Sequence, residues 1–446
     1  MSNAVMSLTE SDLKSCVELA LQEARRLGAS EAEVGVSVDT GLSVTARMHE
    51  VETLEYHRDR GMGITVYRGK RKGSASTADL GAAAIRETVA KAYSIAGFTA
   101  EDPCAGLPDA ADLATDIPDL DLNHPWNIEP DAARDLAVEC EAAALAVDAR
   151  ISNSEGATLS SHQGLRMFGN SLGFIAGYAS TTHSLSCSVV GAHNGDMQRD
   201  YWYSAARDYR DLESAVSIGE RAAKRTIERL GAQRLPTCKV PVLFVPELAR
   251  GFIGHFLGAI RGGSQYRRSS FLLDAAGQQI FPKWFNCVER PHLPKALGSA
   301  PFDAEGVRTH DRTLIDHGVL TGYVLSTYSA RKLGLKTTGN AGGVHNLIVE
   351  SGSDDFAALL KKMDRGLVVA ELMGSGVNGV TGDYSRGAAG FWVEHGQIAY
   401  PVHEITIAGN LRDMYQHIVA VGNDVDARGG VRTGSILLES MTIAGM

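Results

Sequence analysis

The sequence has few cysteines, no long apolar run and no excess of positive charge. Its six cysteines (Cys16, Cys104, Cys140, Cys187, Cys238 and Cys287) lack the Cys-x-x-Cys spacing of metal and redox motifs. No signal-like segment opens the chain, and no window approaches the roughly 20 apolar residues that cross a bilayer. We therefore expect neither a disulfide scaffold nor a membrane protein, and we predict a reduced, cytoplasmic location.

Charge and motif content exclude further classes. The formal net charge of -10 argues against binding to nucleic acid, which needs a concentrated basic surface. The compact basic run at residues 70–72 lies between Gly69 and Gly73, which predicts a hairpin turn. A Gly-x-Ser-x-Gly elbow is missing, and none of the cysteines has a recognisable nucleophile setting. Serine and thiol proteolysis are therefore unsupported.

Length and periodicity predict an α+β protein of two domains. A chain of 446 residues exceeds the size of one growing core, and 44% apolar with 22% charged residues is typical of folded proteins. We expect an N-terminal α+β domain at residues 1–231, made of two similar halves at about 1–97 and 129–231. A Pro/Asp-rich segment, predicted to be exposed, joins the halves. Residues 232–446 are expected to form a glycine-rich β domain with inserted helices.

The residue pattern of each N-terminal half predicts a helix, then a run of strands and then a second helix. In the first half, residues 13–27 repeat apolar positions at helical steps, Thr9 and Asp12 form a capping box, and Asp79 is predicted to cap the closing helix. Short strands are expected near residues 34–38, 42–45 and 64–67.

The second half predicts the same order of elements. Pro130 stands in the first helical turn, and the Asn194-Gly195 pair is typical of a tight hairpin. Leu185, Cys187 and Val189 alternate with serines, as a half-buried strand requires. A closing helix is predicted at about residues 211–230.

The remaining sequence predicts short strands and a few helices. Residues 240–245 indicate a buried strand, and Pro246 begins a helix that contains Gly254 and Ala259. Further helices are predicted at residues 355–363 and 411–419.

Three glycine-rich segments, residues 250–268, 336–347 and 381–392, carry a family resemblance. They read Arg-Gly-Phe-Ile-Gly-His-Phe-Leu-Gly-Ala-Ile-Arg-Gly-Gly-Ser-Gln-Tyr-Arg-Arg, Lys-Thr-Thr-Gly-Asn-Ala-Gly-Gly-Val-His-Asn-Leu and Thr-Gly-Asp-Tyr-Ser-Arg-Gly-Ala-Ala-Gly-Phe-Trp. The chain closely resembles the PmbA (TldE) branch of the TldD/PmbA metalloprotease family, over nearly its whole length. The resemblance implies two related subunits, of which the TldD-like one binds zinc through His-Glu-x-x-x-His and a cysteine near its C-terminus.

None of the zinc ligands that this resemblance implies is present. The first histidine of the motif falls on Gly254, the glutamate on His255, the second histidine on Ala259 and the cysteine on Thr433. Zinc hydrolysis needs protein ligands that leave one position open for an activated water, and glycine and alanine side chains have no donor atom. We predict no catalytic residue, metal or cofactor in this chain, and zinc in a TldD-like partner.

The small residues of this helix have two explanations. Gly254, Gly258 and Ala259 allow close packing against a neighbouring element, or their bare face lines a space beside a partner subunit. A zinc site rebuilt from loop residues such as His345, His395, His403 or Asp383 is a separate alternative, although no His-x-x-x-His pair occurs.

Other polar residues near the glycine-rich segments are candidates for binding a peptide. Asp383, Tyr384, Ser385 and Arg386 stand between glycines, a composition suited to a turn whose side chains enter a cleft. Alternatively, Asp383 satisfies its own turn and Arg386 pairs with a carboxylate. The other candidates, each with a structural role as the alternative, are His345, Asn346, Arg267 and Arg268.

The resemblance implies a heterodimer that acts on unfolded or leader peptides, with antitoxin degradation and modulation of DNA gyrase as associated roles. We predict a non-catalytic subunit that shapes the chamber and holds substrate by strand addition at a sheet edge. The alternatives are an autonomous metallopeptidase and a non-proteolytic regulator that binds gyrase or an antitoxin. A homodimer of the isolated chain is also expected from the family's pseudo-symmetry.

Overall fold

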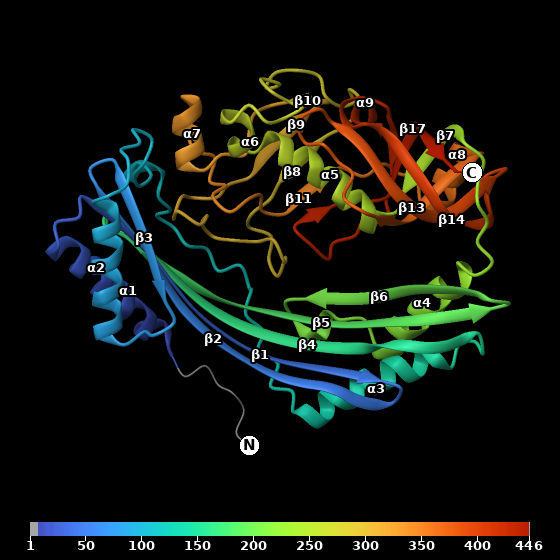
Figure 1. Ribbon diagram of the computed structural model, residues 1–446, viewed down its shortest axis with the longest axis horizontal. Coiled ribbons are helices and arrows are strands. Elements are labelled where there is room, and N and C mark those ends of the chain that lie inside the picture. Colours follow the sequence, from blue (N-terminus) through green and yellow to red (C-terminus); the bar gives the residue numbers. More distant parts are fainter. Residues whose placement is uncertain (1–7, 446) are drawn as a thin grey trace.

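The computed structural model describes residues 8–445, and in it a strongly curved sheet faces a β-barrel (Figure 1). The curved sheet has the order β3-β2-β1-β4-β5-β6. Its strands are β1 (Glu31–Arg47), β2 (Glu50–Arg68), β3 (Arg71–Thr77), β4 (Ile151–Asn170), β5 (Ile175–His193) and β6 (Asp196–Ala206). Antiparallel pairing of β1 with β4 joins the two halves of the N-terminal part into one sheet.

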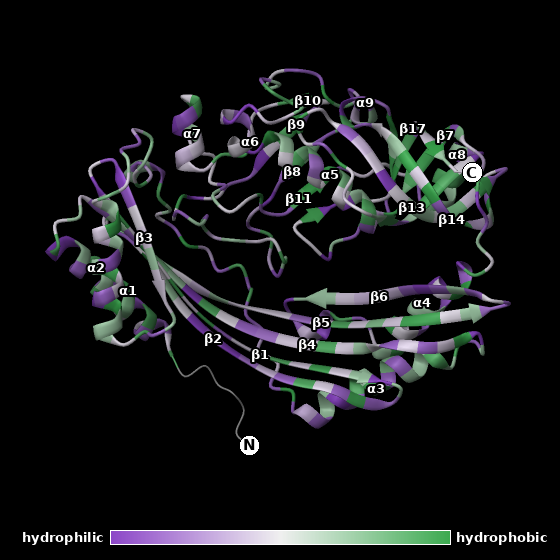
Figure 2. Ribbon diagram, viewed as in Figure 1, coloured by the Kyte–Doolittle hydropathy of each residue, from purple (hydrophilic) through white to green (hydrophobic). Residues whose placement is uncertain are grey.

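Two helix pairs cover the same face of this sheet. They are α1 (Glu10–Arg26) with α2 (Ala82–Ala96), and α3 (Pro130–Leu145) with α4 (Ala215–Glu228). Even-numbered residues of β1, among them Val34, Val36 and Val44, are buried beneath the helices. Each such side chain contributes roughly 1.5–3 kcal/mol on burial. Odd-numbered residues of β1 face the C-terminal part, and the strand colours alternate accordingly in Figure 2.

The C-terminal part contains a closed barrel and a smaller sheet. Strands β14 (Gln397–Asn410), β13 (Asp383–Glu394), β12 (Gly366–Met373), β7 (Cys238–Phe244) and β17 (Ile436–Ala444) pair in that order, and β17 pairs back to β14. Strand β15 (Ile418–Val421) pairs antiparallel with β17. The smaller sheet has the order β10-β9-β8-β11-β16, with β8 (Cys287–Glu289), β9 (Arg312–Asp316), β10 (Val319–Leu320), β11 (Leu347–Val349) and β16 (Val431–Arg432).

Five helices complete this part: α5 (Pro246–Ile260), α6 (Gly262–Tyr266), α7 (Thr327–Leu333), α8 (Phe356–Met363) and α9 (Leu411–Gln416). The largest core cluster joins α5 to barrel residues such as Phe244 and Val369. The mixed composition of helices and sheets confirms the predicted α+β class.

Polar contacts fix the C-terminal part against the sheet. The Arg428 guanidinium donates to the Tyr203 carbonyl of β6 at 2.6 Å, and Arg207 donates to the Leu297 carbonyl at 2.8 Å. At the other end of the sheet, the Tyr328 hydroxyl of α7 donates to Asp102 at 2.7 Å. The concave face of the sheet therefore becomes one wall of an open-sided space between the two parts.

Several local predictions hold and others are wrong. Thr9 and Asp12 form the predicted capping box, but the N-cap of α2 is Gly81, whose N–H donates to Asp79 at 2.8 Å. The helix predicted at 411–419 ends at Gln416, because the chain then enters β15.

The segment between the N-terminal halves is only partly exposed. Four of its leucines are buried: Leu107, Leu113, Leu120 and Leu122. Leu113 forms a bridge with Val307 of the C-terminal part, and the short helix η1 (Ala110–Asp112) precedes it. A second short helix, η2 (Tyr209–Asp211), follows β6. Within residues 8–445 there is no helix with the length and apolarity to span a membrane.

Candidate functional site: a helix with a bare face

Helix α5 is positioned by its apolar face. Pro246 occupies the first turn, and Phe252 and Phe256 are buried in the barrel core. The Tyr415 hydroxyl donates to the Phe252 carbonyl at 2.9 Å, and the Phe252 ring stacks on Phe244 with centroids 5.5 Å apart. These contacts fix one side of α5, so the glycine positions lie on a defined opposite side.

The glycine face of α5 does not pack against another element. Gly251, Gly254 and Gly258 follow one another at three- and four-residue steps and therefore share a face. Apart from the backbone of α5 itself and the chain neighbours, a Cβ added to any of the three would have no heavy atom of the described residues within 4 Å. Close packing is therefore the wrong explanation of these glycines, and the bare face borders open space.

This space is a cavity of about 470 Å³, which we call the bare-helix cavity. Helix α5 contributes Gly254, His255, Gly258 and Ala259 to its wall. The remaining lining comes from Ser264 of α6, the loop after α6, the β12–β13 loop, Arg386 of β13 and the first residue of α9. The cavity thus lies directly over Gly254 and Ala259, two positions at which the family resemblance predicts zinc ligands.

The groups around the cavity carry little charge. Burial lowers the pKa of His255, and the nearby Arg386 guanidinium lowers it further, which keeps the imidazole neutral at physiological pH. Burial raises the pKa of the Tyr384 phenol to about 12, against the opposing effect of Arg386. The Tyr384 ring meets the His255 ring edge-on, with centroids 6.0 Å apart. Among the described residues that line the cavity, Arg386 is the single charged group.

The residues present do not fit a zinc ion on α5. Gly254 and Ala259 offer no donor atom, and Thr433 is buried with its hydroxyl donating to the Gly434 carbonyl at 3.1 Å. Across residues 8–445, His, Cys, Asp and Glu side chains are nowhere grouped in threes that could hold a metal ion. The loop residues that were an alternative ligand set are not brought together.

The residues predicted for a turn at 383–386 begin strand β13. The Thr381 hydroxyl donates to Asp383 at 2.6 Å, and the Asn410 amide donates to Asp383 at 3.3 Å. The Asp383 carboxylate therefore accepts hydrogen bonds that stabilise the local turn. Tyr384 is buried and Ser385 is exposed. The predicted carboxylate partner of Arg386 is not found within the described residues.

His345 and Asn346 do not line the bare-helix cavity. Asn346 is fully buried; its amide accepts from the Gly298 N–H and donates to the Arg290 carbonyl and the Ser299 hydroxyl. It has no exposed group for a substrate. Burial lowers the pKa of His345, whose Nε2 is enclosed and has no hydrogen-bond partner among the described residues.

Arg267 and Arg268 are exposed at the end of α6. Arg267 donates to the Tyr266 hydroxyl at 2.9 Å and lies over that ring at 5.1 Å. Arg268 has a left-handed backbone with φ 54° and pairs with exposed Asp274 at 3.6 Å. Neither arginine lines the bare-helix cavity.

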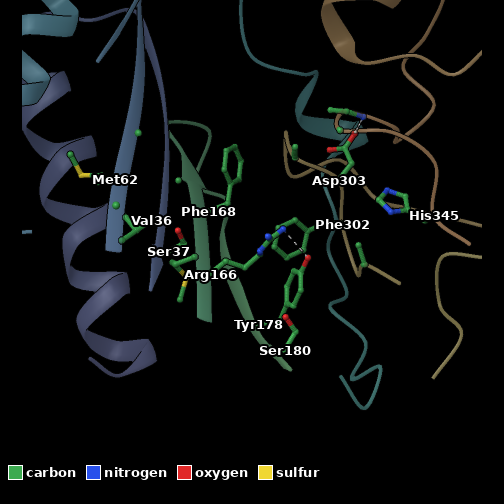
Figure 3. Close-up of a pocket in the computed structure, with 18 of the residues that line it drawn as sticks. Val36, Ser37, Met62, Arg166, Phe168, Tyr178, Ser180, Phe302, Asp303 and His345 are labelled. Atoms are coloured by element: carbon green, nitrogen blue, oxygen red, sulfur yellow. Dashed lines mark hydrogen bonds between the residues drawn. The ribbon is translucent and has the colours of Figure 1, made fainter. Parts of the chain in front are cut away.

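A second cavity, of about 1030 Å³, lies between the concave sheet face and loops of the C-terminal part (Figure 3). We call it the central cavity. Arg166 of β4 projects into it and donates to the Tyr178 hydroxyl at 3.3 Å, while Asp303 and His345 come from the opposite wall. Burial raises the pKa of Asp303 to about 7, against three backbone N–H donors.

Sequence reasoning missed the central cavity because its walls are far apart in the chain. The serines that alternate with Leu185 and Cys187 were a partial sign of a polar surface, since those serines are on the concave face. Two hydroxyl pairs there bridge β1 and β4: Ser43 with Ser160 at 3.0 Å, and Thr45 with Thr158 at 2.9 Å. The concave face therefore carries hydroxyl groups beside charged residues such as Asp39, Asp59 and Arg166.

Three family models match consecutive parts of the chain. They describe the PmbA/TldA metallopeptidase domain 1 at residues 32–96, the central domain at 123–230 and the C-terminal domain at 237–445. The chain is 54% identical to Metalloprotease PmbA of Escherichia coli over 97% of its length and 96% of that protein. It is 48% identical to a Metalloprotease PmbA homolog of Haemophilus influenzae, over 100% of its length and 98% of the homologue.

Solved structures share the fold. A Bacteroides thetaiotaomicron protein whose name refers to modulation of DNA gyrase superposes with a TM-score of 0.93 at 27% identity, covering 98% of this chain and 100% of that one. TldE from Thermococcus kodakarensis superposes with a TM-score of 0.82 at 21% identity, covering 96% and 100% respectively. The second likeness concerns the fold alone.

Proposed function

Because the chain belongs to the PmbA/TldD metallopeptidase family, we propose that it is the metal-free subunit of a two-subunit zinc peptidase. A TldD-like subunit supplies the zinc and the activated water. This chain shapes the chamber and holds unfolded or leader peptides. The observation that carries the proposal is the bare face of α5, where Gly254 and Ala259 replace ligands and leave an open cavity.

The lack of donor atoms on α5 supports a division of labour between subunits. A hydrolytic zinc needs about three protein ligands and one open position. His255 stands where the resemblance expects a general base, yet without a neighbouring metal-bound water it has no proton to take from a nucleophile. Helix α5 therefore packs against the barrel core but lacks the ligands that a hydrolytic zinc ion would need.

The curved sheet offers two means of holding an extended peptide. Its concave face presents hydroxyl groups such as those of Ser43 and Thr45, which can bond to peptide N–H and C=O groups without requiring a particular side chain. In addition, β3 pairs with β2 only from Met62 to Arg68, so the Glu50–Gly61 portion of β2 is a sheet edge that no strand within residues 8–445 covers. Strand addition at that edge would satisfy its unpaired backbone groups.

Reconstitution tests the proposed function. The purified chain, a TldD-like subunit and an unfolded peptide are mixed in all combinations, and cleavage is followed by mass spectrometry. We expect efficient cleavage from the pair and none from this chain alone. Elemental analysis after dialysis should locate zinc in the TldD-like subunit only. Chelator-sensitive hydrolysis by the isolated chain would contradict the proposal and favour an autonomous metallopeptidase.

A second candidate function is regulation of gyrase or an antitoxin by binding without proteolysis. The name of the Bacteroides thetaiotaomicron structure favours it. Capture of gyrase by this chain from a strain without the TldD-like subunit would support independent binding. Loss of capture in that strain would assign the interaction to the two-subunit enzyme instead.

A further inference from the structure

Arg386 is an arginine without an acidic partner in a half-buried position. Among the described residues its guanidinium forms no ion pair, and its Nε is enclosed without a hydrogen-bond partner. Two other arginines of the C-terminal part have acidic partners: Arg312 pairs with Glu289 at 3.6 Å, and Arg428 pairs with Asp426 at 2.9 Å. A charge withdrawn from water without compensation costs free energy, and an incoming anion would offset that cost.

The cavity that Arg386 lines contains no competing acid. The lining includes no aspartate or glutamate. His255 is held neutral by burial and by Arg386 itself. Hydroxyls of Ser269 and Ser375 supply further neutral donors at the wall. A single positive charge with neutral donors is complementary to a ligand group with one negative charge.

The C-terminal end of α5 borders the same cavity, and its partial negative charge would oppose an anion if its carbonyls were free. They are not free. The Ser264 hydroxyl donates to the Gly258 carbonyl at 2.8 Å, while Gln265 and the Ser270 hydroxyl both donate to the Ala259 carbonyl, at 2.7 and 2.8 Å. Side-chain donors therefore satisfy the last turn of α5 and weaken its repulsion of an anion.

Space for the ligand is already present. A cavity of about 470 Å³ over Gly254 and Gly258 accommodates a short stretch of extended peptide, and added Cβ atoms there would meet nothing within 4 Å. The glycines thus keep the backbone of α5 accessible at the floor of the cavity.

We propose that the bare-helix cavity binds a carboxylate of an unfolded peptide, with Arg386 as its cation. The planar guanidinium matches a carboxylate in charge and in geometry. Peptide is the ligand class because the inference rests on the proposed function. The carboxylate comes from a peptide C-terminus or from an acidic side chain, and the experiment distinguishes these sources.

The test measures binding of three short unstructured peptides to the full chain by fluorescence anisotropy. One peptide has a free C-terminal carboxylate, the second is its C-terminal amide, and the third is the amide with one internal aspartate. We expect one carboxylate peptide to bind roughly tenfold to a hundredfold more tightly than the plain amide. Preference for the first identifies the C-terminus as the source, and preference for the third identifies the side chain.

Three variants separate Arg386 from general charge and from folding. Arg386→Gln should abolish the preference for carboxylate. Arg432→Gln is the matched control, since Arg432 is also half-buried without an ion pair but lies outside the lining of this cavity, and it should keep the preference. Gly258→Leu should block binding without loss of thermal stability, because its side chain fills open space.

The possible failures have different meanings. Equal binding of all three peptides, an unchanged preference in Arg386→Gln, or no peptide binding by the folded chain would each overturn the carboxylate subsite. Reconstituted cleavage with the TldD-like subunit would still stand in those cases. Conversely, a carboxylate preference that depends on Arg386, together with failed reconstitution, would support the subsite and reject the subunit role.

Discussion

Gly219 of α4 lies against Cys140 of α3 so closely that a Cβ on the glycine would be 2.0 Å from the Cys140 carbonyl oxygen. This glycine permits two helices to approach each other, whereas Gly254 of α5 faces a cavity. Replacing each by alanine should therefore have opposite effects. Gly219→Ala should lower the free energy of unfolding by about 1–3 kcal/mol through overpacking. Gly254→Ala should raise it by about 1 kcal/mol through helix propensity.

Chemical denaturation of the two variants beside the parent chain measures both effects. Circular dichroism and tryptophan fluorescence should give coincident transitions if the comparison is valid. Destabilisation by Gly254→Ala of the same size as by Gly219→Ala would show that α5 is packed against another element after all.

Asp303 should make stability depend on pH near neutrality. Its folded-state pKa is about 7, above the ordinary 3.8, because burial disfavours the charged carboxylate. The folded state then keeps a proton that the unfolded state has lost. The contribution is fully present below about pH 4 and is lost as pH rises to about 7, on the order of 4 kcal/mol in total.

Urea unfolding of the parent chain and of Asp303→Asn across this pH range checks the sign. The variant should lose stability overall, because an amide cannot accept all three backbone N–H bonds, yet its profile should be flatter between pH 4 and 7. An identical pH slope in both proteins would rule out Asp303 as the titrating group.

Asp102 should hold the segment between the N-terminal halves against α7. Hydrogen bonds from Tyr328, the Cys104 N–H and Lys332 lower its pKa to about 2, so the carboxylate remains charged and bonded until the pH falls toward that value. Asp102→Asn should increase the rate of limited proteolysis within residues 97–128 at pH 7. Asp116→Asn, an exposed change in the same segment, should leave the rate unaltered.

The sequence predicted elements whose signal is local. Pro246 at the start of α5, the Thr9 capping box and the Asn194-Gly195 hairpin all depend on residues within a few positions of one another, and all are confirmed. The resemblance placed Gly254 and Ala259 where zinc ligands are expected, and the lack of a donor atom in these two side chains is visible without coordinates.

Predictions that depended on distant neighbours were less successful. The glycines of α5 were compatible with close packing or with open space, and only the positions of the β12–β13 loop and β13 distinguish the two. In the segment between the N-terminal halves, nothing in the sequence around Leu113 and Leu120 indicated that the C-terminal part would cover these leucines. The proposed role of Arg386 likewise depends on the lack of an acidic residue in the described lining of its cavity, which is a property of the fold. The domain limits and the residues that hold substrate remain predictions.

The free edge of β2 should be an association surface. Val51, Leu54 and Tyr56 on the unpaired portion of this strand are 43%, 44% and 61% exposed, next to backbone groups that have no partner strand in the described part of the chain. Unprotected apolar edges pair readily with other strands, and a lysine there opposes such pairing. Leu54→Lys should therefore weaken self-association of the isolated chain, and binding to a TldD-like subunit, by roughly tenfold or more.

Sedimentation velocity measures both kinds of association. Val419→Lys, at 42% exposure on β15, is the matched control. If the two variants associate as the parent does, the β2 edge is not the contact surface, and strand addition there should be sought with substrate peptides instead.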